Sequence, residues 1–269
     1  MKLRHVASAA LAFGLLAPPG AVAQDGRITP VLSTTMQRVC QVETTRVLLM
    51  NAGEAVANPQ PTIERQTSSV RASQTDNGWV IVSTSDGPRG DLMLRAEMAA
   101  DGAVTAATLS GAIIEASSGT PGADIPAATS AMADDVPERL LVGRTFALGD
   151  SYYPEALRRS LLDRMAAGLG MPVDLSGSID MRYEGEVEFE GRRAWRFAGR
   201  ITGAGQITIN ARGAAIMFDH VTEAVALHDA ETGLLVKYDA EANDRTKLNG
   251  RPFRHQRKTD AITCDIIPQ

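Results

Sequence analysis

Short turn dipeptides between runs of strand length constrain the fold of this chain more than any other feature. Each ends in glycine, which adopts the positive φ that hairpin turns require. Strands do not alternate regularly with helices along the sequence, so a parallel sheet with crossover helices is not expected. The chain is therefore predicted to be mainly β, an antiparallel meander folded as a curved sheet, half-barrel or sandwich. The dipeptides are Asn77-Gly78, Asp101-Gly102, Glu190-Gly191, Thr232-Gly233 and Asn249-Gly250.

The runs between these turns are expected to be strands. In one hairpin, a loop of Phe189, Glu190 and Gly191 would place Tyr183 opposite Phe197 and Glu184 opposite Arg196. This register would give one charged face and one aromatic face, which cross-strand pairing favours. The expected strands cover residues 35–49, 67–73, 78–84, 91–99, 103–110, 179–188, 193–201, 205–211, 214–228, 234–242 and 252–265.

The first residues have the pattern of a cleavable secretory signal peptide. Lys2 and Arg4 precede an apolar run that ends at Leu16, and Ala21-Val22-Ala23 follow it. The run is shorter than the about 20 residues that cross a bilayer, and the small residues form a cleavage site. Residues 1–23 are therefore expected to be removed, which would place the mature protein in the periplasm or outside the cell.

Cleavage near Ala23–Gln24 would leave residues 24–269, which are expected to form a single antiparallel β domain. The full chain has 27 basic and 32 acidic residues, a net charge of −5, and becomes more acidic when the leader is lost. A nucleic-acid partner is not expected, because phosphate binding needs clustered lysine and arginine. No later apolar stretch has the length of a membrane span, so no transmembrane segment is expected in the mature chain.

Two cysteines lie near the two ends of the mature chain, Cys40 and Cys264. In an oxidising compartment such a pair is expected to form a disulfide. The bond would bring the two Cα atoms within about 7 Å of each other, so the first and last strands would meet. Two buried free thiols are the alternative interpretation. A catalytic thiol is disfavoured, since the sequence contains no Cys-x-x-Cys.

One amphipathic helix is expected after the first group of strands. Pro154 fits its first turn, and Gly168 and Gly170 would end it. The helix could cap the core or form a movable lid over an apolar pocket, and the sequence leaves both open. Residues 111–137, rich in Ala, Ser, Gly and Pro, are expected to form a long flexible connection before it. The apolar stripe of the helix is Leu157, Leu161, Leu162, Met165 and Leu169.

The sequence lacks the common patterns of catalysis and cofactor binding. A Gly-x-Ser-x-Gly nucleophile turn and a glycine-rich phosphate loop ending in lysine are both absent. His220 and His228 could share one strand face, but their separation along a strand would be roughly 26 Å, too far to hold one metal. No cofactor, metal site or catalytic residue is therefore expected.

Two charged segments have ordinary structural interpretations. Glu184, Glu186, Glu188 and Glu190 alternate along one strand, and their spacing permits a carboxylate pair. The facing arginines would keep these groups ionised, so a solvated outer face is favoured over a hydrolase site. The basic run 251–258 is interpreted as an exposed edge strand, where charges discourage aggregation.

The second half of the chain resembles a known group of envelope proteins. The segments that carry the resemblance are Val142–Ser151, Tyr183–Glu188, Glu190–Phe197 and Asp229–Leu235. Their succession is similar to bacterial envelope proteins that share the curved antiparallel sheet of the periplasmic lipoprotein carriers, the LolA-like group. The resemblance covers roughly residues 140–265. It implies an open half-barrel with helices over its concave side and acyl chains held between them.

The leading functional expectation is non-catalytic binding of a lipid or another apolar or amphipathic molecule between sheet and helix. An envelope interaction protein that meets a protein partner through a sheet edge or the 111–137 segment is a second hypothesis. A hydrolase is a third, and it would need polar side chains that converge from separate strands. Under the leading hypothesis, the pocket would be lined by Leu157, Leu161, Leu162, Met165 and Trp195.

Overall fold

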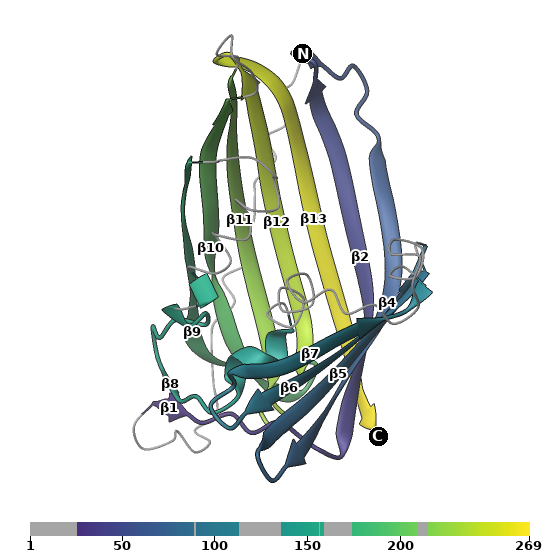
Figure 1. The fold of residues 1–269 in the computed structure, drawn as a ribbon, viewed down its shortest axis with the longest axis vertical. Coiled ribbons are helices and arrows are strands. Elements are labelled where there is room, and N and C mark those ends of the chain that lie inside the picture. The colour runs from purple at the N-terminus through teal and green to yellow at the C-terminus, as the bar shows by residue number, and fades with distance from the viewer. Residues whose placement is uncertain (1–25, 89, 113–135, 156, 159–173, 209–214) are drawn as a thin grey trace, which may run out of the picture.

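The computed structural model describes residues 26–88, 90–112, 136–155, 157–158, 174–208 and 215–269. Most of them form one curved antiparallel sheet of 11 strands, which confirms the predicted fold class. Within the described residues β7 and β9 stand at the two ends of the strand order, so the sheet is open (Figure 1). The strands are β2 (Met36–Asn51), β3 (Glu54–Ala55), β4 (Pro61–Thr75), β5 (Gly78–Gly87), β6 (Gly90–Ala99), β7 (Val104–Ser110), β9 (Asp174–Phe189), β10 (Arg192–Thr208), β11 (Ala215–Asp229), β12 (Leu235–Leu248) and β13 (Arg251–Pro268).

The first and last strands of this sheet, β2 and β13, pair with each other at its centre. The strand order is β7-β6-β5-β4-β2-β13-β12-β11-β10-β9, and β3 pairs with β2. Cys264 on β13 lies directly opposite Cys40 on β2, and the predicted disulfide joins them with the Cα atoms 4.0 Å apart. The basic run 251–258 therefore belongs to a central strand, and the prediction of an edge strand was wrong. Strand order is a non-local property that the local charge pattern does not encode.

A second correction concerns the length of β10. The sequence indicated separate strands over 193–201 and 205–211, because glycines interrupt the pattern between them. In the structure β10 continues without a break through Gly203 and Gly205, which pair with His220 and Phe218 of β11. Glycine is tolerated inside a strand where the ladder on both sides holds the backbone extended.

The predicted β9–β10 hairpin is correct in one part and wrong in another. Its turn contains only Glu190 and Gly191, whose φ angles of 52° and 77° are both left-handed. Phe189 therefore pairs with Arg192, so the longer loop expected from the sequence was wrong. A two-residue turn of this kind has the twist that suits the flanking strands. This backbone preference outweighs the cost of mixing charged and aromatic side chains on one face near the turn.

A β-bulge then restores the predicted register farther along the same hairpin. Arg196 pairs with Gly185 but Phe197 pairs with Tyr183, so Glu184 is the extra residue. The insertion shifts the pairing by one residue and returns the aromatic side chains to the same face. The predicted pairing of Tyr183 with Phe197 is confirmed.

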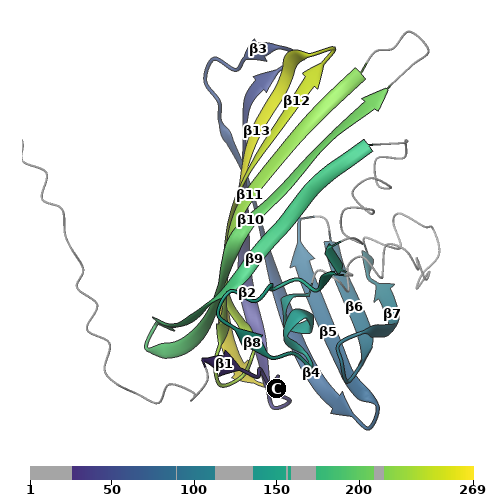
Figure 2. The same cartoon turned by 90° about the vertical axis from the view of Figure 1, so that its left-hand side faces the viewer.

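The chain between β7 and β9 includes a segment that lies in the concave space between strands β4–β7 and strands β9–β13 (Figure 2). We call residues 136–152 the inner segment; it contains a 3₁₀ helix, η1 (Pro137–Leu141), and β8 (Phe146–Ala147), which pairs with β1 (Arg27–Ile28). Figure 2 shows β8 lying between strands β9–β13 and strands β4–β7. The sheet face that packs against this segment is called the inner face, and the opposite one the outer face.

Several expectations fall on residues outside the described part of the chain. The predicted signal peptide lies there entirely, and the 111–137 connection is described only at its two ends. The predicted helix after Pro154 is described only at Glu155, Leu157 and Arg158, so a single packed helix is not confirmed. Among the described residues, no helix has the length and hydropathy needed to cross a membrane.

Candidate functional site

One continuous row of side chains crosses the inner face from β2 to β9. Successive pairs in the ladder place these residues directly opposite one another on neighbouring strands. They belong to, or pack against, a buried core that we call the apolar cluster. This row, called the apolar row below, consists of Val42, Ile262, Tyr238, Ala226, Phe197 and Tyr183.

The apolar row changes from filled core to accessible surface along its length. Phe197 and Ala226 are fully buried, and the ring of Tyr152 from the inner segment packs on Phe197 with centroids 4.5 Å apart. Phe146 adds a second aromatic contact to Phe197 at 5.1 Å. Tyr238, Ile262 and Val42 are only partly buried at the edge of the cluster. The inner segment therefore covers one end of the row, and the side chains at the other end remain partly accessible.

Two of the five residues predicted to line a pocket are described, and both belong to the apolar cluster. Leu157 and Trp195 are each 6 % exposed, so they are part of the packed core. The indole Nε1 of Trp195 is buried without a hydrogen-bond partner in the described part of the chain. Leu161, Leu162 and Met165 lie outside the described residues.

A buried ion pair fastens the inner segment to the sheet. The guanidinium of Arg38 on β2 donates through Nε and Nη2 to the carboxylate of Glu138, at 2.5 and 3.3 Å. The backbone N–H of Leu235 donates to the same carboxylate at 3.1 Å. Burial would raise the pKa of the Glu138 carboxyl, but the charges of Arg38 and His228 and these hydrogen bonds outweigh it and lower the pKa.

A second buried contact joins the inner segment to β11. The Tyr152 hydroxyl lies 2.8 Å from Nε2 of His228, and Nδ1 of His228 lies 3.1 Å from the Gly233 carbonyl oxygen. Because a carbonyl can only accept, we infer that Nδ1 carries the proton and Nε2 accepts from Tyr152. Burial lowers the pKa of His228 to about 4, against the opposing effects of Glu138 and of the Gly233 hydrogen bond.

The pKa of His228 predicts how stability depends on pH. An unfolded histidine takes up a proton below pH of about 6.5, whereas folded His228 stays neutral down to about 4. The free energy of unfolding should therefore fall as the pH drops from 6.5 to 4, by up to about 3 kcal/mol from this group. Urea unfolding at several pH values measures the slope. His228→Phe should flatten it within this window, and an unchanged slope would contradict the assignment.

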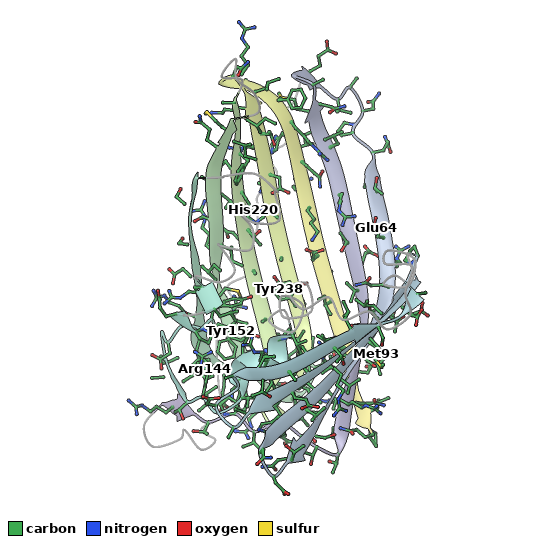
Figure 3. The ribbon with its side chains drawn as sticks, viewed as in Figure 1. Glu64, Met93, Arg144, Tyr152, His220 and Tyr238 are labelled. Carbon is green, nitrogen blue, oxygen red and sulfur yellow. A yellow bond between two sulfur atoms is a disulfide. The ribbon has the colours of Figure 1, made fainter. Side chains whose placement is uncertain are left out.

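A different polar group lies on the inner face farther from the apolar cluster. Nδ1 of His220 on β11 is 2.5 Å from Oδ1 of Asp244 on β12, and Nε2 is 2.7 Å from the Thr222 hydroxyl. Figure 3 shows His220 farther up the strands than Tyr238 and Tyr152. The sequence did not indicate this contact, because the pairing of His220 with Asp244 depends on the register of β11 and β12.

The order of hydroxyl, imidazole and carboxylate resembles a nucleophile relay, but the backbone around it does not support acyl transfer. Such a reaction needs backbone or side-chain donors aimed at a developing oxyanion. β11 is paired on both sides at Thr222, with Ile201 of β10 and Ala242 of β12, so the amides of this stretch are committed to the ladder. The contacts therefore satisfy three polar groups on the sheet. Within the described residues, no group of His, Cys, Asp and Glu side chains could hold a metal ion.

Charges on β2, β4 and β13 form two bands beside the apolar row. Glu64 and Asp260 form the carboxylate band and lie on either side of Thr44. The hydroxyl of Thr44 donates a hydrogen bond to the Asp260 carboxylate at 2.6 Å. Arg46 and Lys258, the cation band, lie directly opposite each other, one step farther from the apolar row. Arg46 pairs with Glu64 at 2.8 Å and Lys258 with Asp260 at 2.6 Å.

A pocket of about 260 Å³ opens beside these bands, next to the end of β5. The partly buried Val42 of the apolar row forms part of its wall. Polar and apolar surface therefore meet in one pocket. Its lining includes Val42, Thr44, Arg46, Glu64, Arg65 and Gln66, together with residues at the end of β5 and the start of β6.

The outer face carries a shallow groove of mixed charge. It has a volume of about 700 Å³ over β9 to β13, and Arg200, Glu223 and Glu241 are among its lining residues. Glu184 pairs there with Arg196 at 2.7 Å, and both side chains are well exposed. The glutamates of β9 are thus solvated and faced by arginine, as the sequence indicated.

No protein-family model matches this chain, and no curated protein matches it in sequence.

Proposed function

We propose that this protein binds a lipid or another amphipathic small molecule on the inner face of its open sheet and does not transform it chemically. We also propose that it acts in the periplasm or outside the cell after removal of residues 1–23. The resemblance to the LolA-like carriers supports the first proposal, because that group holds acyl chains against a curved antiparallel sheet. The leader pattern of residues 1–23 supports the second.

The partly buried end of the apolar row carries this proposal. Val42, Ile262 and Tyr238 lie side by side on three neighbouring strands and continue the buried apolar cluster toward the surface. Neighbouring strands are about 4.8 Å apart, so the row from Val42 to Ala226 extends over roughly 14 Å. An extended hydrocarbon chain laid across the strands would cover it, and the polar groups beside it would contact the head of the ligand.

The proposal can be tested by placing a charge on either face of one strand. Ile262→Asp introduces a carboxylate into the apolar row, which should weaken binding about tenfold or more because the charge loses solvent when the tail binds. Thr263→Asp places the same charge on the next residue, whose side chain points to the outer face and is exposed. We expect that variant to bind normally. Isothermal titration calorimetry with dodecyl maltoside, whose head is uncharged, measures both.

Equal affinity of the two variants would contradict the proposal. Far-UV circular dichroism and thiol titration, which reports the disulfide, check that each variant is folded. Native mass spectrometry of protein purified from the cell envelope, followed by organic extraction, would identify a bound molecule. Absence of both a bound mass and dodecyl maltoside binding would favour the hypothesis of an envelope interaction protein.

A further inference from the structure

Side chains from three neighbouring strands, β4, β2 and β13, together form successive levels on the inner face. Moving away from the apolar cluster, β2 presents Val42 and then Arg46, and β13 presents Ile262, Asp260 and Lys258. On β4, Glu64 lies level with Asp260, because both flank Thr44. An apolar row, a carboxylate band and a cation band thus follow one another, and the spacing between successive levels is about 6.6 Å.

The pocket next to these bands has the size of a head group. At about 260 Å³ it is smaller than the cavities that enclose whole drug-sized ligands, which begin near 300 Å³. Val42 of the apolar row, Glu64 of the carboxylate band and Arg46 of the cation band all line it. A head group in the pocket could therefore extend its tail along the apolar row without crossing a charged band.

We propose that the pocket and its two bands bind the head of a zwitterionic amphiphile in which the cationic group adjoins the tail and the anionic group lies beyond it. In this orientation the cation meets Glu64 and Asp260, and the anion meets Arg46 and Lys258. A head of the opposite charge order would bring its anion against the carboxylate band. This inference rests on the proposed function, since it assumes that the tail binds the apolar row.

The existing ion pairs do not block such a ligand. The side chains of Arg46 and Glu64 are 33 % and 38 % exposed, and those of Lys258 and Asp260 are 32 % and 23 % exposed. Pairs this accessible to water hold together weakly. A zwitterion of the matching order replaces each internal pair by an equivalent pair with the ligand. A ligand with a single net charge would satisfy one band and leave the other without a partner.

Three detergents with the same dodecyl tail test the inference below their critical micelle concentrations. In dodecyl sulfobetaine the ammonium adjoins the tail and the sulfonate lies beyond it, and in dodecyl phosphocholine the order is reversed. Dodecyl maltoside is neutral. Isothermal titration calorimetry on the mature protein should show the sulfobetaine binding about tenfold more tightly than the phosphocholine, the effect expected of two partly exposed ion pairs.

Reversing the bands should reverse the preference. The variant with Arg46→Glu, Glu64→Arg, Lys258→Asp and Asp260→Lys keeps the net charge and both ion pairs, but exchanges the two bands. It should bind the phosphocholine more tightly. Should that variant fail to fold, Glu64→Gln with Asp260→Asn removes only the carboxylate band and should abolish the preference for sulfobetaine.

The outcomes separate the head-group inference from the function on which it rests. Equal binding of all three detergents would overturn the inference while leaving tail binding intact. Tighter binding of the phosphocholine by the unmodified protein would also overturn it. If none of the three binds, the proposed function fails and the inference fails with it.

Discussion

Replacing Cys40 and Cys264 together by alanine should lower the free energy of unfolding by about 3 to 5 kcal/mol. The bond joins residues 224 positions apart, and it links the two central strands of the sheet directly. Without it the unfolded chain gains the entropy of a very long loop, and the upper figure follows from that loop length. Urea unfolding should show the midpoint shifted down by about 1 M or more.

Reduced wild-type protein provides the matched control for this variant, because it loses the bond but keeps the sulfur atoms. We expect both to unfold at nearly the same urea concentration. A stable reduced protein beside an unstable alanine variant would show that packing of the two sulfurs, which lie in the apolar cluster, matters more than the covalent link. A change of less than 1 kcal/mol in both would contradict the expected stabilisation.

Glu138→Gln should destabilise the protein by about 3 to 5 kcal/mol, because it leaves the charge of Arg38 buried without a counterion. The side chain of Arg38 is 7 % exposed and that of Glu138 is fully buried. The amide of the variant can still accept the hydrogen bond from Leu235, so the lost charge is the main change. Urea unfolding at pH 7 measures the effect.

The exposed ion pair on β9 and β10 is the matched control. Glu184→Gln removes the same charge from a pair with Arg196, but both groups remain accessible to water, so the loss should stay below about 1 kcal/mol. Replacing both buried partners, by Arg38→Met with Glu138→Leu, should recover much of the stability, because no unpaired charge remains. Equal losses for Glu138→Gln and Glu184→Gln would rule out the role assigned to the buried pair.

Much of the candidate binding face could have been read from the sequence once the disulfide was assumed. Cys40 opposite Cys264 sets the register of β2 and β13, and in that register Val42 faces Ile262 and Arg46 faces Lys258. The alternation of side chains then places all of them on one face. The basic run was instead interpreted by its charge alone, which hid its alignment with β2.

The buried polar contacts could not have been found in this way. Glu138 and Arg38 are far apart in the sequence, and a single glutamate in a short 3₁₀ helix gives no sign that it will be fully buried. His228 and Tyr152 likewise meet only because the inner segment enters the angle of the sheet. Contacts of this kind depend on how the strands curve, and curvature arises from the packing of the whole sheet.

The sequence by itself determined the antiparallel strands, their alternating faces and the position of most turns, because these follow from local backbone preferences and from side-chain periodicity. It also determined the partner of each cysteine, because the chain contains only two. Only the tertiary structure decided that β13 lies at the centre, that a bulge at Glu184 corrects the β9–β10 register, and that Glu138 is buried on Arg38. Each of those features depends on a local preference, of a turn, a strand pairing or a charge, and also on how distant segments pack. A local sequence pattern contains only the first of these.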